Sequence, residues 1–158
     1  LALRYIVANL KILVIGRVEA FFDTVLFKTA SRALLFGIFL TILVQSSSIT
    51  TSLVVPLAGA GILTLRQIFP MTLGANVGTT ITAMLAALVT GELSSVTVAL
   101  AHVLFNITGI VLIWPMRAVP LYLANTLAES AIRSRLTPAI YIALMFFMVP
   151  LALIYLMG

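Results

Sequence analysis

The sequence predicts an all-α integral membrane protein with a re-entrant helical hairpin and a broken transmembrane helix. Of its 158 residues, 63% are hydrophobic and 8% are charged, and the mean hydropathy is +1.26. Soluble domains carry about 25% charged residues, so this composition indicates a chain that lies in a bilayer. Two interruptions of apolar runs predict the hairpin and the break: a polar tetrad at 45–48 and a glycine-rich stretch at 74–80.

The charge pattern excludes a nucleic-acid-binding role. The net charge is +5, but the nine basic residues stand singly between apolar runs, as loop anchors of membrane proteins do. Cysteine is absent, which rules out a disulfide scaffold and thiolate metal sites. The chain begins with Leu1 rather than methionine, so we expect it to be a piece of a longer protein.

Residues 1–32 are predicted to form an interfacial or scaffold helix, with apolar positions at helical spacing over 3–28. Several charged residues punctuate this segment, and a charge at the centre of a bilayer costs about 3 kcal/mol or more. We therefore expect the segment to lie along the interface or to pack on other protein. Glu19 and Asp23 are interpreted as part of a solvated face.

Residues 33–63 allow two interpretations around the tetrad Gln45-Ser46-Ser47-Ser48. The apolar run before it, 33–44, would make a helix of about 18 Å, too short for the ~30 Å hydrocarbon core. Either 33–55 is one spanning helix with buried serines, or the chain turns at the tetrad and returns to the side from which it entered. Non-helical backbone at that depth is tolerated only where protein or a cavity surrounds it.

The placement of charges favours the hairpin, because a returning chain leaves Arg32 and Arg66 on one side of the membrane. Every loop arginine then falls on one face and Glu92 on the other, which makes the arginine face cytoplasmic. The remaining predicted elements are a crossing over 67–90, a span over 95–116, an interfacial stretch over 117–137 and a last span over 138–157.

The stretch Gly74-Ala75-Asn76-Val77-Gly78-Thr79-Thr80 has low helix propensity, so we expect the helix over 67–90 to be broken there. A break would expose two half-helix ends with opposite partial charges, a common way to build ion sites in transporters. The alternative is that the small residues serve close helix packing.

His102 and Asn106 share one face of the span over 95–116, because they are four residues apart. Either side chain could contact a ligand or relay protons, but we interpret them as interhelical hydrogen-bonding groups that order the bundle. A single histidine without a nearby carboxylate makes a poor metal site.

The two interruptions together predict a site for an anion and a cation. The hairpin tip offers hydroxyls and the N–H groups of the helix that starts near Ser48, whereas the glycine-rich stretch offers carbonyls, an amide and threonine hydroxyls. No carboxylate lies between Asp23 and Glu92, so a proton-coupled mechanism would depend on His102 alone. Sodium, which neutral oxygens satisfy, is the better coupling ion.

These motifs also carry a resemblance to a known family. The tetrad QSSS, then Pro56, then GANVGTT, then Ala101-His102-Val103-Leu104-Phe105-Asn106 resemble the type II sodium-dependent phosphate cotransporters in order and spacing. The resemblance covers about 33–157 and implies a transporter of two inverted repeats, each with a QSSS hairpin. Residues 33–158 would form the second repeat, one half of the transport unit.

The resemblance further implies which residues bind the ligands. It implies seven site residues at the hairpin tip and the glycine-rich stretch, and their division between the ligands is our own assignment: phosphate to Ser46, Ser47, Ser48 and Thr80, and sodium to Gln45, Asn76 and Thr79. The implied function is sodium-coupled symport of inorganic phosphate by alternating access. It implies a multi-pass protein of the plasma or inner membrane, with no enzymatic activity and no cofactor beyond the coupling ion.

Only one QSSS and one GANVGTT are present, so half of the implied site lies elsewhere. It would come from a missing repeat of a longer protein, which we favour, or from a second copy in the membrane. Alternatives are another sodium-coupled anion carrier, for dicarboxylates or sulfate, and a structural membrane subunit. A serine hydrolase using Ser47 and His102 is disfavoured, because no glycine-flanked serine elbow and no orienting carboxylate are present.

Overall fold

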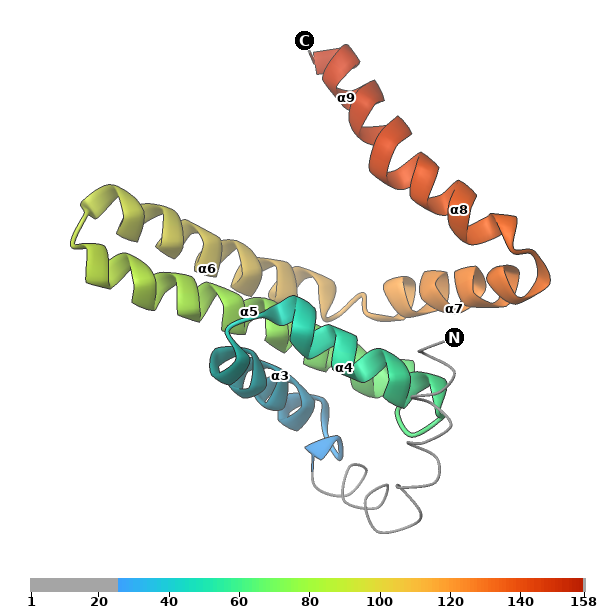
Figure 1. The fold of residues 1–158 in the computed structure, drawn as a ribbon, viewed down its shortest axis with the longest axis horizontal. Coiled ribbons are helices and arrows are strands. Elements are labelled where there is room, and N and C mark those ends of the chain that lie inside the picture. Colours follow the sequence, from blue (N-terminus) through green and yellow to red (C-terminus); the bar gives the residue numbers. More distant parts are fainter. Residues whose placement is uncertain (1–25, 158) are drawn as a thin grey trace. The chain divides into compact units, whose positions relative to one another are not determined.

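The computed structural model describes residues 26–157, and every regular element in this range is a helix. The predicted helix over 3–28 lies almost wholly outside the described residues. The chain divides into two compact units after Pro115. The elements are α3 (Ala30–Val44), α4 (Ser47–Gly59), α5 (Leu65–Thr90), α6 (Leu93–Ile113), α7 (Ala118–Arg133), α8 (Leu136–Ala143), the π-helical segment η2 (Leu144–Met148) and α9 (Val149–Met157) (Figure 1).

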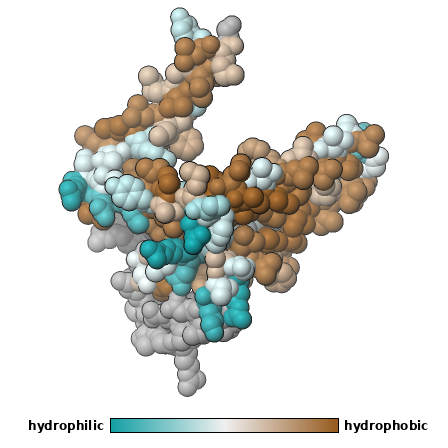
Figure 2. Space-filling view, turned by 180° about the vertical axis from the view of Figure 1, so that it is seen from behind, coloured by the Kyte–Doolittle hydropathy of each residue, from teal (hydrophilic) through white to brown (hydrophobic). Residues whose placement is uncertain are grey.

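Within the described range, three helical segments are long and apolar enough to cross a membrane: Leu65–Thr90, Leu93–Ile113 and Leu136–Met157. They agree with the predicted crossings over 67–90, 95–116 and 138–157 to within a few residues. The two helices before them, α3 and α4, are apolar but too short to span. Hydrophobic side chains cover most of the outer surface of α5 and α6 (Figure 2). The prediction of an all-α membrane protein is confirmed.

Helices α3 and α5 run parallel and touch backbone to backbone. Gly37 of α3 lies against the carbonyl of Met71, Gly74 of α5 lies against Leu34, and Gly78 lies against Ile38. Residue numbers on the two helices rise together along this contact, which fixes the parallel direction. A β-carbon at Gly37 or Gly74 would collide with main-chain atoms of the other helix, so only glycine permits this approach.

The predicted helix break at 74–80 is wrong, because α5 is helical without interruption from Leu65 to Thr90. The glycines at 74 and 78 are four residues apart and therefore lie on one face, where they admit α3. Ala75 is fully buried beside them. Small-residue packing, the alternative interpretation of this stretch, accounts for its composition.

The polar tetrad does end a helix. α3 stops at Val44, Gln45 adopts a left-handed conformation with φ 55°, and Ser46 is extended and caps α4. The Oγ of Ser46 accepts a hydrogen bond from the amide of Ile49 (3.3 Å), as a helix cap requires. This turn excludes one continuous helix over 33–55. Because α3 and α5 run parallel, α4, which connects them in the sequence, runs in the opposite direction and returns the chain to the end at which α5 begins (Figure 1).

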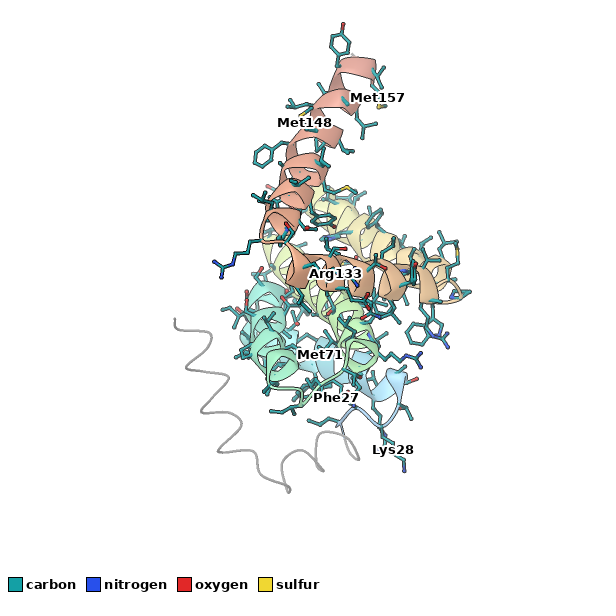
Figure 3. The ribbon with its side chains drawn as sticks, turned by 90° about the vertical axis from the view of Figure 1, so that its right-hand side faces the viewer. Phe27, Lys28, Met71, Arg133, Met148 and Met157 are labelled. Carbon is teal, nitrogen blue, oxygen red and sulfur yellow. The ribbon has the colours of Figure 1, made fainter. Side chains whose placement is uncertain are left out.

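A small core joins the ends of α3, α4 and α5 that lie away from the tetrad. Phe27 packs edge-on against Phe36, with ring centroids 5.8 Å apart. The buried members of this core are Phe27, Ala33, Val54, Ile62, Leu63 and Met71. Phe27 and Met71 are labelled in Figure 3. The core holds the beginning of α3 against the beginning of α5.

The second unit contains α7 and the run α8–η2–α9. α7 occupies most of the predicted interfacial stretch over 117–137 and ends before Ser134. The last run is helical from Leu136 to Met157 but widens into a π-helix over 144–148. Pro150 stands two residues after this segment. A proline inside a helix removes a hydrogen bond and crowds the carbonyl four residues earlier, here that of Phe146, which accounts for the widening. Met148 and Met157 mark this run in Figure 3.

Candidate functional site

The hairpin tip lies beside the middle of α5. Gln45, at the tip, and Thr79, near the centre of the 26-residue helix, line the same cavity. The contact of Gly78 with Thr41, four residues before the tip, fixes the same level independently. α5 therefore extends beyond the tip toward Thr90 and below it toward Leu65. The tetrad therefore lies beside the middle of α5, a helix long enough to cross a membrane.

A polar cavity of about 340 Å³ opens next to the tip. It is lined by side chains from α4, α5 and α6, all of them polar: Ser47, Asn76, Thr79, His102 and Asn106. Three of these, Ser47, Asn76 and Thr79, are predicted site residues, so the structure brings the tetrad and the glycine-rich stretch together as expected. The uninterrupted α5 achieves this with one helix face, because Asn76 and Thr79 are three residues apart.

Two members of the cavity are already engaged by main-chain carbonyls. The Thr79 hydroxyl donates to the carbonyl of Ala75 (3.2 Å), which leaves its lone pairs to face a ligand. Nδ2 of Asn106 donates to the carbonyl of Asn76 (3.4 Å) and so joins α6 to α5. This interhelical bond is the role that the sequence suggested for Asn106. It also sets the register that brings His102 beside Thr79.

A second cavity, of about 550 Å³, adjoins the first through Thr79. Gln45 and Thr82 supply its other polar side chains, whereas its remaining lining is apolar. Gln45 thus faces the part of α5 that extends past the tip. Among the described residues, neither cavity is lined by a lysine, arginine, aspartate or glutamate.

The other three predicted site residues lie outside these linings. The Ser46 side chain caps α4, and its carbonyl accepts hydrogen bonds from the amide and the hydroxyl of Thr50. Ser48 is exposed on the first turn of α4. Thr80 is fully buried, and its hydroxyl donates to the carbonyl of Val77 (2.7 Å). Thr80 stands four residues after Asn76 on α5 but is not part of the cavity lining.

Two features of the site are hard to predict from the sequence. His102 lines the cavity, although the preferred interpretation of its spacing from Asn106 is interhelical hydrogen bonding. Thr41 and Thr50 form a fully buried pair behind the tip, with Oγ1 of Thr41 donating to Oγ1 of Thr50 (3.1 Å). Threonines in an apolar run do not reveal a partner nine residues away across a turn.

The chain is similar in sequence to a family model and to several known transport proteins. The sequence model of a family described as "Na+/Pi-cotransporter" matches residues 1–149. The chain is 42% identical over 129 residues to sodium-dependent phosphate transport protein 2B of Bos taurus, which covers 78% of this chain and 19% of that protein. It is 42% identical over 126 residues to protein 2C of Rattus norvegicus (76% and 21%) and 38% identical over 127 residues to protein 2A of Oryctolagus cuniculus (77% and 20%). The matched region is about one fifth of each relative's length. No solved structure matches.

Proposed function

Because this chain belongs to the Na+/Pi-cotransporter family, we propose that it forms part of a membrane transporter that carries inorganic phosphate together with sodium. The observation that carries the proposal is the polar cavity that the hairpin tip shares with the middle of α5. The relatives that it matches are sodium-dependent phosphate transport proteins. Three apolar helices in the described range accord with a membrane location.

The helix lengths support a re-entrant hairpin. At about 1.5 Å per residue, α3 and α4 reach about 20 Å each, whereas the 26 residues of α5 extend about 39 Å. A hairpin of that length, packed against the first half of α5, places Gln45 and Ser46 near the bilayer centre. Arg32 and Arg66 then lie near the same membrane face, since both stand early in parallel helices, and we assign this face to the cytoplasm.

The proposed division of ligands follows from donors and acceptors. Ser47 begins α4, and the first turn of a helix presents unpaired N–H groups with partial positive charge. Phosphate would bind there, with the hydroxyls of Ser46, Ser47 and Ser48. Sodium would take neutral oxygens from Asn76, Thr79 and Gln45. Thr80 would reach phosphate only after a rearrangement, because it is fully buried and its hydroxyl already donates to the carbonyl of Val77.

We assign the other half of the site to a second, inverted repeat, and transport to alternating access between the two. One tip and one cavity that, among the described residues, has no lysine or arginine in its lining offer few donors for a phosphate, so we expect a second set of ligands. The match covers about one fifth of each relative's length, so the rest of such a protein could contain the second repeat.

The test is phosphate uptake into proteoliposomes that contain the complete transport unit, with external sodium replaced by choline or potassium. We expect uptake to fall to the level of protein-free vesicles in both replacements. Uptake that persists without sodium would contradict the coupling. Competition by excess sulfate or dicarboxylate identifies the substrate class, and displacement of phosphate by either would indicate another anion carrier.

A further inference from the structure

His102 is the titratable side chain that lines the polar cavity in the described residues. It belongs to α6, whose other exposed side chains are mostly apolar, among them Val98, Leu104 and Phe105. An imidazole at this depth of a membrane-length helix is costly unless a polar partner or ligand compensates it. His102 lies in the polar cavity rather than on the apolar face of α6, so a ligand bound there would supply that compensation.

Some polar groups of the cavity lining already have hydrogen-bond partners, but the side chain of His102 remains available as a donor. The hydroxyl of Thr79 and one N–H of Asn106 are committed to main-chain carbonyls. Among the described residues, the His102 side chain makes no hydrogen bond, and the other remaining side-chain donors of the lining are Ser47, Asn76 and the second N–H of Asn106. A neutral imidazole offers one N–H, and a protonated imidazole offers two together with a positive charge. No other side chain in the lining can carry a positive charge.

We propose that His102 is an oxyanion ligand, donating an imidazole N–H to phosphate held between α4, α5 and α6. Asn106 is its positioning residue, because the bond from Asn106 to the carbonyl of Asn76 fixes the register of α6 on α5. The ligand is an anion rather than sodium, since an imidazole N–H is a hydrogen-bond donor, whereas a hard cation such as sodium is held by oxygen atoms. This assignment extends the site by one helix and rests on the proposed function for the identity of the anion.

The experiment compares His102→Leu, His102→Gln and wild type in the complete transport unit. His102→Leu should raise the phosphate concentration for half-maximal uptake by about tenfold or more, the loss expected when a hydrogen bond to a charged group is removed. The sodium concentration for half-maximal uptake at saturating phosphate should stay unchanged. His102→Gln keeps an N–H donor and should recover part of the affinity. Thr108→Val, an exposed polar position of α6 outside the cavity, is the matched control and should behave as wild type.

An unchanged phosphate requirement in His102→Leu would overturn the inference. So would a lower maximal rate with both ligand requirements unaltered, which indicates a structural role. Thermal stabilisation of the purified protein by phosphate and by sulfate separates this inference from the proposed function. If wild type transports no phosphate but an oxyanion stabilises it and not His102→Leu, then His102 is a ligand and the transport proposal fails. If neither anion stabilises wild type, the inference fails.

Discussion

The hydroxyl of Thr41 donates to the hydroxyl of Thr50 across the hairpin turn, at 3.1 Å, and both side chains are fully buried. Thr50 in turn donates to the carbonyl of Ser46 (3.0 Å). This relay ties the last turn of α3 to the first turn of α4 and to the backbone of the tip itself. It satisfies three polar groups that would otherwise be costly in an apolar setting.

Replacing Thr50 with valine should destabilise the protein by about 1–3 kcal/mol, because the Thr41 hydroxyl loses its acceptor while still buried. The measurement is thermal or denaturant unfolding of the purified chain in detergent. Thr41→Val/Thr50→Val should recover part of the loss, since no hydroxyl of the pair is then left unpaired. Thr97→Val, an exposed threonine of α6, should change stability little. Equal effects at 50 and 97 would argue against the relay.

Replacing Gly74 with alanine should cost about 1–3 kcal/mol of stability, because the new β-carbon would overlap main-chain atoms of Leu34, which cannot rotate away. Gly109 of α6 is the control, since a β-carbon there meets no atom within 4 Å. Gly109→Ala should leave stability unchanged or raise it by up to about 1 kcal/mol through helix propensity. The two unfolding curves, measured side by side, test whether α3 and α5 touch as described.

Replacing Ser47 with alanine should lower phosphate uptake at subsaturating phosphate by about tenfold or more, because it removes a hydroxyl from the cavity. Ser52→Ala, at an exposed position of the same helix, should transport normally. Surface expression must be equal in both variants. Wild-type uptake in Ser47→Ala would show that the tetrad serves the turn alone.

Replacing Asn76 with leucine should raise the sodium concentration needed for half-maximal uptake, since a neutral oxygen is removed from the proposed sodium ligands. The control is Asn125→Leu, an exposed asparagine of α7. Sodium titrations at saturating phosphate measure the effect. A sodium requirement unchanged from wild type would remove Asn76 from the sodium site.

Cysteine labelling tests the orientation, because the sequence contains no cysteine of its own. A cysteine at Leu65, next to Arg66, should react with a membrane-impermeant reagent from the cytoplasmic side. A cysteine at Glu92, in the turn between α5 and α6, should react from the opposite side. Labelling of both from one side would contradict the crossing by α5.

The turn at 45–48 could be predicted because four consecutive polar residues interrupt an apolar run, and polar groups at membrane depth need partners or a ligand. The stretch at 74–80 was harder to predict, because the same glycine spacing occurs in a helix that breaks and in a helix that packs closely against a neighbouring helix. The neighbour, Gly37, lies 37 residues earlier, and nothing local to the stretch points to it. Thr80 was grouped with Thr79, but its side chain is fully buried and its hydroxyl donates to the carbonyl of Val77, which the sequence does not reveal. His102 was visible as a polar residue, but only the packing of α6 on α5 places it in the cavity.

The glycine contact between α3 and α5 has a mechanical consequence. Backbones that meet without intervening side chains cannot slide past each other, because each glycine is seated against a carbonyl of the other helix. We therefore expect α3, the first helix of the hairpin, and α5 to move as one rigid unit. Any motion that exposes the cavity to the other side of the membrane must carry this pair together, or must flex the chain at the extended residue Ser46 while α4 shifts against it.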